Sequence, residues 1–365
     1  MIRRPPRSTQ GVSSAASDVY KRQILNWYDK NKRDLPWRKT SNPYKIWLSE
    51  VMLQQTRVET VIPYYNNWLQ NYKTIQSVAH ANLDELLKIW EGLGYYSRCK
   101  NFYYAAQRIH YKYNGIIPNQ FDVFKSLPGV GDYIAGAVMS IAFNQPHPSI
   151  DGNHRRVISR ILGIKNLSRY NKNRMNNFLK KLVSIDRPGD INQALMDIGS
   201  TICKPKEVFC DFCPVQFECK ACILSKPLEY PKKTYKKKIP TRNLVAAIIE
   251  YGDYILISKR PVDGQLGGLW ELPNIELKNG ESPEKLLKKS INTHFACTIK
   301  VGKNLGFIHH TFTHFKMNIT LFRCILKHNQ KVDPSAKWIR WSELDQYAFS
   351  KGNHKLFQLY QKENV

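Results

Sequence analysis

The fold of this chain is decided by Leu127-Pro128-Gly129-Val130-Gly131, by the small and apolar run at residues 132–143, and by Asp151-Gly152-Asn153. Gly129 and Gly131 permit a tight turn with unusual backbone dihedrals, and the run that follows has helical apolar spacing. A helix entered through a glycine turn presents backbone N–H groups at its N-terminus, where the helix dipole favours an anion. We therefore expect two helices joined by a hairpin over residues 122–143, with Gly129, Val130 and Gly131 facing a nucleic-acid phosphate.

A carboxylate follows this hairpin. Asp151 lies after Pro146 and Pro148 and directly before a second expected helix at residues 154–162. There its side chain can cap the helix, and the helix dipole keeps it ionised. Taken alone, the glycine turn and Asp151-Gly152 are each more often structural than functional. Their succession makes Asp151 a candidate for chemistry that needs a fixed negative charge.

A second carboxylate, Glu50, lies in an expected helix at residues 44–56. Asn42 supplies an N-cap and Pro43 the first helical position, and the helix is largely apolar. A glutamate in such a helix usually faces water. If Glu50 is buried instead, its pKa rises and it becomes a candidate general acid near neutral pH.

Length and charge limit the possible functions. The chain has 365 residues, enough for two domains, and a formal net charge of +27, which predicts a polyanionic partner although a bias toward lysine would also raise it. No apolar run reaches the length of a membrane span, and no signal peptide is recognisable. We expect a cytoplasmic, nucleoid-associated protein of bacterial type. Residues 1–23 lack periodicity, and we expect them to be a non-native or disordered extension.

Four cysteines form the strongest local signal, with C-x6-C-x2-C-x5-C spacing at Cys203, Cys210, Cys213 and Cys219. Cytosolic cysteines at such intervals are metal ligands rather than disulfide partners. Four thiolates suit zinc or a [4Fe-4S] cluster, and the spacing does not choose between them. The other cysteines, Cys99, Cys222, Cys297 and Cys324, are expected to be plain buried thiols. Lys204 and Lys206, between the first two ligands, are expected to contact DNA phosphates.

The composition changes after Cys222. Prolines and lysines at residues 226–241 indicate a basic linker. Residues 244–250 and 254–259 are expected to form a strand hairpin, residues 283–290 a helix, and strands follow through Leu326. Residues 242–365 are therefore expected to be a smaller α+β domain.

Together these features resemble one family, the MutY-type adenine DNA glycosylases of the helix-hairpin-helix superfamily. The resemblance covers the chain from about Ile24 and is carried by the hairpin, Asp151-Gly152-Asn153, the four cysteines, Leu35-Pro36-Trp37-Arg38, Trp47-Leu48-Ser49-Glu50-Val51-Met52-Leu53-Gln54-Gln55-Thr56 and Glu91-Gly92-Leu93-Gly94-Tyr95-Tyr96-Ser97-Arg98. It implies an all-α catalytic domain at residues 24–225 with a [4Fe-4S] cluster in the segment 203–219. It also implies a monomer that removes adenine opposite 8-oxoguanine or guanine in double-stranded DNA.

The resemblance implies residue roles as well. Glu50 would protonate the leaving adenine, and Asp151, with Asn153 beside it, would stabilise the cationic sugar, a two-carboxylate task related to glycoside hydrolysis. Tyr133 stands where bifunctional relatives carry the lysine that forms a Schiff base, so strand cleavage is expected to be weak or absent. Gln55 and Tyr95 would wedge into the base stack. Trp37 and Arg38 would line the adenine pocket.

The C-terminal domain resembles a Nudix fold through Gly267-Gly268-Leu269-Trp270-Glu271-Leu272-Pro273. The metal-binding glutamates of Nudix hydrolases are missing, because residues 285–290 stand in their place, so we expect no Nudix hydrolysis. The family uses this domain to recognise 8-oxoguanine through a Phe-Ser-His loop. Here the loop is Phe312, Thr313 and His314, in which threonine keeps the hydroxyl and adds a methyl group.

Two other functions remain open. One is an endonuclease III-like pyrimidine glycosylase with lyase activity, against which Tyr133 and the Nudix-like domain argue. The other is a catalytically silent DNA-binding protein, against which the presence of both Glu50 and Asp151 argues.

Overall fold

Contacts within the chain divide it into two units. The computed structural model describes residues 14–183, 186–232, 239–278, 280–312, 315–326 and 333–363. Unit 1 contains Met1–Tyr65, Thr74–Gln76 and Tyr104–Tyr235. Unit 2 contains Asn66–Lys73, Ser77–Tyr103 and Lys236–Val365. Thr313 and His314 lie outside the described residues.

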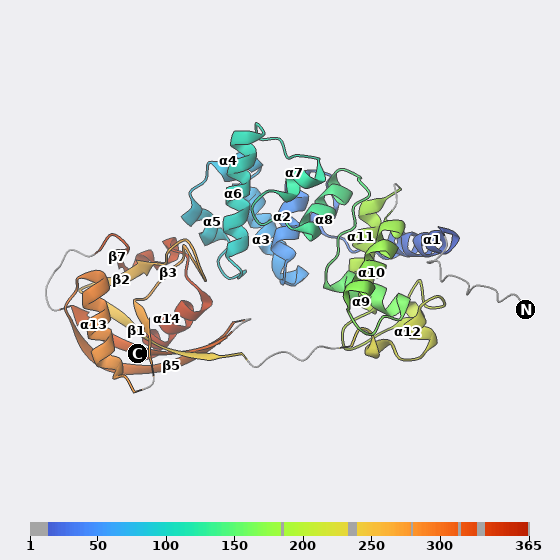
Figure 1. Ribbon diagram of the computed structural model, residues 1–365. Helices are drawn as coiled ribbons and strands as arrows, with labels where there is room; N and C mark the ends of the chain where they lie inside the picture. Colours follow the sequence, from blue (N-terminus) through green and yellow to red (C-terminus); the bar gives the residue numbers. More distant parts are fainter. Residues whose placement is uncertain are drawn as a thin grey trace, which may run out of the picture. The chain divides into compact units, whose positions relative to one another are not determined.

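Unit 1 is helical, as Figure 1 shows. Its elements are α1 (Ser14–Asn31), η1 (Pro36–Arg38), α2 (Pro43–Leu53), α7 (Phe121–Lys125), α8 (Asp132–Ala142), α9 (Gly152–Leu162), α10 (Arg169–Leu182), α11 (Pro188–Asp197), η2 (Ile198–Ile202), η3 (Cys210–Phe212), α12 (Lys220–Ile223) and η4 (Pro227–Glu229). Three helices have residues in both units: α3 (Val58–Asn71), α4 (Ile75–Ala79) and α6 (Ser97–Lys112). No helix among the described residues is long and apolar enough to cross a membrane.

Helix α2 begins as expected but ends early. The Asn42 side chain accepts hydrogen bonds from the backbone N–H groups of Tyr44, at 2.9 Å, and Lys45, at 3.3 Å. The helix ends at Leu53 rather than Thr56, because Gln55 adopts a positive φ of 57°, which an α-helix does not accommodate. The expected helix was therefore three residues too long.

Helix α1 begins before the expected domain boundary. It starts at Ser14, so residues 14–23 are helical rather than outside the fold. The Tyr20 hydroxyl donates to the Glu218 carbonyl at 3.1 Å, and the Gln23 amide donates to the Glu218 carboxylate at 2.9 Å. The sequence did not predict the first ten residues of this helix, because few of them are apolar.

The expected hairpin lies between α7 and α8. Gly129 has a φ of 74°, the left-handed conformation that favours glycine, whereas Gly131 has an extended φ of −98° that any residue could adopt. The expectation of unusual dihedrals is therefore confirmed for Gly129 and wrong for Gly131. Gly136 in α8 allows the helix to approach the loop before Asp151 closely. A Cβ at this position would lie 2.2 Å from the Pro148 carbonyl oxygen, which is too close for any side chain. Helix α8 thus packs directly on the loop that leads to Asp151.

Unit 2 contains α5 (Leu83–Ile89) and a mixed sheet between two helices (Figure 1). The strands run in the order β3-β2-β1-β6-β5; β4 pairs with β1 and β7 with β2, and β1 and β6 are parallel. One face of the sheet packs on α13 through Leu287 and Ile291, and the other on α14 through Leu356 and Phe357. The bounds are β1 (Thr241–Tyr251), β2 (Tyr254–Lys259), β3 (Trp270–Glu271), β4 (Asn274–Glu276), α13 (Pro283–Phe295), β5 (Ile299–Thr311), β6 (Lys316–Leu326), β7 (Ala336–Arg340), η5 (Trp341–Gln346) and α14 (Lys351–Glu363).

The residues around α5 join unit 2 through polar contacts. Glu91 accepts from the Phe349 backbone N–H and contacts His354 Nε2, each at 2.7 Å. The Lys259 ammonium lies 2.7 Å from the Asp84 carboxylate. These contacts group residues 77–103 with the C-terminal domain, although sequence order places them in the expected catalytic domain.

A buried carboxylate ties the N-terminal segment of unit 1 to α11. Asp197 is fully buried and accepts from Arg33 Nε at 2.8 Å and from both terminal nitrogens of Arg38, at 2.6 and 3.0 Å. The Arg38 contact is bidentate, the strong form of this ion pair.

We predict that Asp197→Asn lowers the free energy of unfolding of unit 1 by about 3 kcal/mol, because it leaves two guanidinium groups without their buried partner. Guanidinium chloride titration followed by far-UV circular dichroism measures the change. Asp34→Asn is the matched control, since Asp34 pairs with Lys39 on the surface and its loss should cost less than about 1 kcal/mol. Equal effects of the two substitutions would contradict the structural role of Asp197.

Candidate active site

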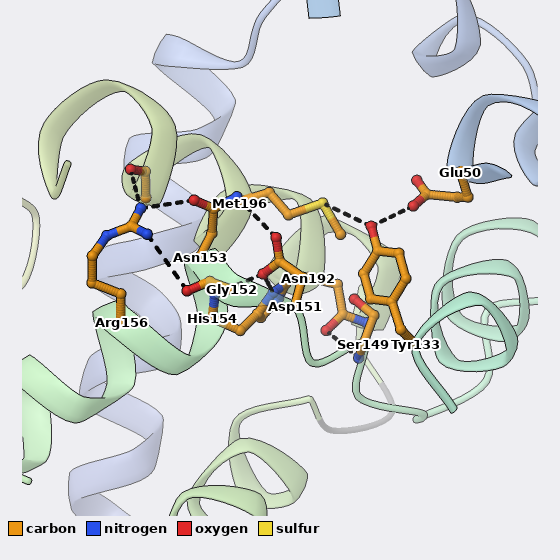
Figure 2. A network of polar contacts seen from close by, with 11 residues as sticks. Glu50, Tyr133, Ser149, Asp151, Gly152, Asn153, His154, Arg156, Asn192 and Met196 are labelled. Atoms are coloured by element: carbon orange, nitrogen blue, oxygen red, sulfur yellow. Dashed lines mark hydrogen bonds and ion pairs between the residues drawn. The ribbon is translucent and has the colours of Figure 1, made fainter. Parts of the chain in front are cut away.

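Glu50 is the buried carboxyl group of α2. Only 4% of the residue is exposed, and its Oε2 accepts a hydrogen bond of 2.6 Å from the Tyr133 hydroxyl of α8 (Figure 2). Burial raises the pKa of Glu50 to about 7; the hydrogen bond from Tyr133 acts in the opposite direction, and the charge of Asp151 adds to the rise. The burial that the sequence left open is confirmed. Glu50 can hold a proton near neutral pH.

Tyr133 stays protonated beside Glu50. Burial, followed by the negative charges of Glu50 and Asp151, raises its pKa well above the usual value. The phenol therefore acts as a hydrogen-bond donor to the carboxyl group. It has no amine with which to form a Schiff base.

Asp151 is the N-cap of α9, as expected. Its Oδ1 accepts from the His154 backbone N–H at 2.8 Å and lies 2.7 Å from His154 Nδ1, while its Oδ2 accepts from the Asn153 amide at 2.9 Å (Figure 2). Burial alone would raise the pKa of Asp151, but the contacts with His154 and Asn153 outweigh burial and lower it. Asp151 is therefore an anion where Glu50 is an acid.

Two residues around Asp151 were not found from the sequence. His154 is fully buried, and among the described residues its Nε2 has no hydrogen-bond partner. Arg156 donates to the Asn153 side chain at 2.7 Å, to the Gly199 carbonyl at 2.6 Å and to the Cys203 carbonyl at 2.7 Å. The i, i+3 spacing of Asp151 and His154 at a helix start was the available signal for His154. Arg156 had none, because its partners are distant in sequence.

The expected wedge residues share a backbone feature. Gln55 has a φ of 57° and Tyr95 a φ of 49°, a conformation that L-residues adopt at a cost. Such strain often occurs at functional positions. Tyr95 is 41% exposed, so its ring is accessible. DNA contact by these two residues stays a prediction.

The expected adenine-pocket residues have structural partners. Trp37 is buried and packs edge-on against Tyr65, with 5.3 Å between the ring centroids. Arg38 binds Asp197 and also lies near enough to Glu50 to oppose the rise of its pKa. Contact of Trp37 or Arg38 with adenine stays a prediction.

The hairpin supplies one further candidate contact with DNA. Helix α8 has no side-chain cap at Gly131, so the backbone at its start is not occupied by a capping side chain. Val130 is buried, and Lys125 pairs with Asp132 at 2.6 Å beside the turn. This arrangement suits a phosphate at the helix N-terminus.

All four motif cysteines line one apolar cavity, which lies between α9 and the segment from η2 to η4. The cavity is lined by Arg160, Ile202, Cys203, Val208, Phe209, Cys210, Cys213, Gln216, Cys219, Cys222 and Pro227. Arg160 is 2% exposed and donates to Cys203 Sγ at 3.0 Å. Among the described residues, no three His, Cys, Asp or Glu side chains are grouped as one bound metal ion would require. Soft sulfur donors around a shared cavity nevertheless fit an iron–sulfur cluster.

The expectation for Cys222 was wrong. It was expected to be a plain buried thiol, but it is half-buried and lines the same cavity as the motif cysteines. Burial raises the pKa of Cys210 to about 11, and a side-chain hydrogen bond with Cys222 adds to this rise. Cys99, Cys297 and Cys324 are buried, as expected. Lys204 and Lys206 follow Cys203, and Lys204 lies over the Phe209 ring at 4.8 Å.

Unit 2 contains a larger cavity of about 690 Å³. It is lined by Gly92, Gly94, Tyr95, Tyr96, Ser97, Arg242, Gly264, Gln265, Leu266, His310, Thr311, Phe312, Phe315, Ser350 and Lys351. Phe312 stacks on Phe315, with 4.8 Å between centroids, and packs edge-on against His310. The structure thus brings Phe312 and Tyr95 to one cavity, a connection the sequence did not reveal.

Family profiles and known proteins match both parts of the chain. Residues 48–184 match the HhH-GPD superfamily base excision DNA repair protein family, and residues 244–359 match the NUDIX domain. The adenine DNA glycosylase of Rattus norvegicus is 32% identical over 98% of this chain and 81% of its own. The adenine DNA glycosylase of Buchnera aphidicola from Acyrthosiphon pisum is 37% identical over 82% of this chain and 85% of its own.

Solved structures agree on the helical fold. A thermostable thymine-DNA glycosylase matches with a TM-score of 0.53 and 28% identity, covering 57% of this chain and 97% of its own. A trapped endonuclease III–DNA covalent intermediate matches with a TM-score of 0.51 and 20% identity, covering 59% of this chain and 99% of its own. Because a curated relative 32% identical matches nearly the whole chain and four fifths of its own length, this chain belongs to the adenine DNA glycosylase family of base-excision repair enzymes.

Proposed function

We propose that this protein hydrolyses the N-glycosidic bond of adenine opposite 8-oxoguanine or guanine in double-stranded DNA. The observation that carries the proposal is the pair of carboxyl groups whose pKa values are shifted in opposite directions, that of Glu50 to about 7 and that of Asp151 downward. Two carboxyl groups separated in this way are the means by which glycosidases divide acid and anion roles. The family names support adenine as the base.

Glu50 supplies the proton. A purine leaves as an anion unless a ring nitrogen is protonated, and a neutral carboxyl group of pKa about 7 can transfer its proton at physiological pH. The Tyr133 hydroxyl, 2.6 Å from Oε2, then stabilises the carboxylate that remains. That carboxylate can accept the proton of the water that adds to the sugar.

Asp151 supplies the negative charge. Breaking the bond leaves a cationic sugar, which a nearby carboxylate stabilises in a site that excludes water. The contacts with His154 and Asn153 fix the orientation of Asp151 before the substrate binds. Asp151 would thus lower the activation barrier for breaking the glycosidic bond, and no Schiff base with a lysine is needed.

The cysteine loop, residues 203–219, is proposed to hold a [4Fe-4S] cluster through Cys203, Cys210, Cys213 and Cys219. The cluster, when bound, cross-links the loop rather than reacting with the base. Arg160 would donate to a ligand sulfur, and the same guanidinium binds the Lys204 carbonyl at 2.9 Å. Lys204 and Lys206 would then be presented to DNA phosphates from a fixed loop.

Unit 2 is proposed to read the base opposite adenine. Its cavity of about 690 Å³ is flanked by aromatic rings at Tyr95 and Phe312, which suit stacking on a base. The expected hydroxyl donor or acceptor, Thr313, follows Phe312 in the chain. The net charge of +27 supports DNA as the partner. We also propose that the protein is a monomer and acts in the cytoplasm.

Duplexes that contain A opposite 8-oxoguanine, A opposite G, and oxidised pyrimidines test the proposed function. We expect release of adenine from the first two duplexes and no release from the third. Borohydride should trap no covalent complex, since Tyr133 cannot form an imine. Release of oxidised pyrimidines with a trapped complex would establish the endonuclease III-like alternative, and binding without release would establish the non-catalytic one.

We predict that Glu50→Gln abolishes adenine release yet stabilises the protein at high pH. The pKa of Glu50 is about 7 in the fold against 4.5 as the ordinary value, so above pH 7 the fold holds a buried carboxylate at a cost of about 3 kcal/mol, which an amide avoids. The gain should therefore be present at pH 8.5 and disappear near pH 4.5. In the wild type, release should decline as pH rises through 7.

Denaturation midpoints at the two pH values and single-turnover rates measure these changes. Glu59→Gln is the control, because Glu59 is exposed in the first turn of α3 and should alter neither quantity greatly. Normal adenine release by Glu50→Gln would remove the acid role. A pH-independent stability difference would contradict the raised pKa.

We predict that Thr313→Val reduces the preference for A opposite 8-oxoguanine over A opposite G by about 5- to 10-fold, the effect of losing one polar contact with a base. Thr313→Ser keeps the hydroxyl and should keep the preference. The ratio of single-turnover rate constants on the two duplexes is the measurement. Equal loss in both variants would show that the hydroxyl is not what reads the opposite base.

A further inference from the structure

Five thiols, rather than four, face the cavity of the cysteine loop. Cys203, Cys210, Cys213 and Cys219 have the spacing of a ligand set, and Cys222 lines the same cavity. The remaining cysteines do not line it, and Cys297 and Cys324 belong to the core on one face of the sheet of unit 2. Cys222 is therefore distinguished from the other non-motif cysteines by position.

The geometry of α12 explains why Cys222 faces the cavity. Cys219 is the N-cap of this helix, and the Cys222 N–H donates to the Cys219 carbonyl at 3.0 Å. Residues three apart in a helical turn lie on the same side of it. A turn that directs Cys219 toward a cluster thus directs Cys222 toward it as well.

Cys222 also lies close to particular thiols of the cavity. After burial it is the neighbour that most raises the pKa of Cys210, and it acts on Cys219 as well, whereas the thiols that raise the pKa of Cys213 are Cys203, Cys219 and Cys210. If Cys210 were lost, the thiol beside the vacated position would be Cys222. No comparable substitute is present for Cys213 among the described residues.

We propose that Cys222 is a reserve ligand that takes the coordination position of Cys210 when Cys210 is removed or oxidised, an inference that rests on the proposed cluster. With a peroxide as the oxidant, the Cys210 thiolate would become a sulfenate while the peroxide is reduced to water. Cys222 would then release its thiol proton to solvent and hold, as a thiolate, the iron that Cys210 held. One thiolate replaces another, so the ligand charge and the oxidation state of the cluster do not change. Cys210 is the ligand this would protect, because it begins η3, whose other two residues, Asp211 and Phe212, are exposed.

Iron and sulfide content of the full chain, purified without oxygen, tests the proposal. The wild type and Cys222→Ala should each contain about four iron atoms per chain, as a [4Fe-4S] cluster requires. Cys210→Ala should retain the cluster with a changed absorbance and electron paramagnetic resonance spectrum. The double variant Cys210→Ala/Cys222→Ala should lose it, and so should the control Cys213→Ala.

The outcomes separate the two proposals. Zinc or no metal in the wild type would overturn the cluster and the reserve ligand together. A wild type with iron, together with equal loss of iron in Cys210→Ala and Cys213→Ala, would overturn the reserve ligand alone, as would full retention in the double variant.

A second measurement does not depend on the folding of Cys210→Ala. Under hydrogen peroxide, the cluster absorbance should decay several-fold faster in Cys222→Ala than in the wild type, because oxidised Cys210 then has no replacement. Cys99→Ala is the control and should decay like the wild type. Equal decay in Cys222→Ala and the wild type would contradict the protective role.

Discussion

The hydrogen bonds donated to the Asp151 carboxylate are the contacts on which the candidate site depends. A carboxylate enclosed to this extent stays ionised only if donors replace the water that it has lost, and the backbone of His154, its imidazole and the Asn153 amide do so. Asn153 is itself held by Arg156. The position of the negative charge therefore depends on the position of α9.

Helix α9 is fixed by the cysteine loop. Arg156 donates to the Cys203 carbonyl at 2.7 Å, and Arg160, one turn later on the same side of the helix, donates to Cys203 Sγ at 3.0 Å. A Cβ at Gly199 would lie 2.6 Å from Cβ of Asn153, so the backbone of η2 approaches the helix start closely. Through these contacts the segment around Cys203 holds the beginning of α9, where Asp151 is the N-cap.

Sequence reasoning found the residues whose local pattern carries information. Asp151 was identified as an N-cap by its place before a helix, and the four motif cysteines by their spacing. The burial of Glu50 could not be decided, because it depends on α8 packing against α2 and placing Tyr133 beside it. Arg156 and Cys222 act through partners that are brought near only by the fold. The hairpin followed from its glycines and the apolar spacing after them, and the helical domain was implied by the family resemblance. The grouping of residues 77–103 with the C-terminal domain could not be predicted, because it depends on contacts of Glu91 and Asp84 far along the chain.

Gln55 and Tyr95, the two residues expected to wedge into the base stack, are among the described non-glycine residues with a positive φ. Positive φ at Gln55 and Tyr95 costs roughly 1–2 kcal/mol for each residue, and such a conformation persists only where neighbours enforce it. At Tyr95 the enforcing residue is Arg98, which is 8% exposed, donates to the Gly94 carbonyl at 2.9 Å and lies 5.3 Å from the Tyr95 ring. Arg98 fixes this turn before DNA binds. The exposed Tyr95 ring could therefore enter a base stack without a further loss of backbone conformational entropy. Arg98 is then the residue that converts a strained turn into a preorganised one.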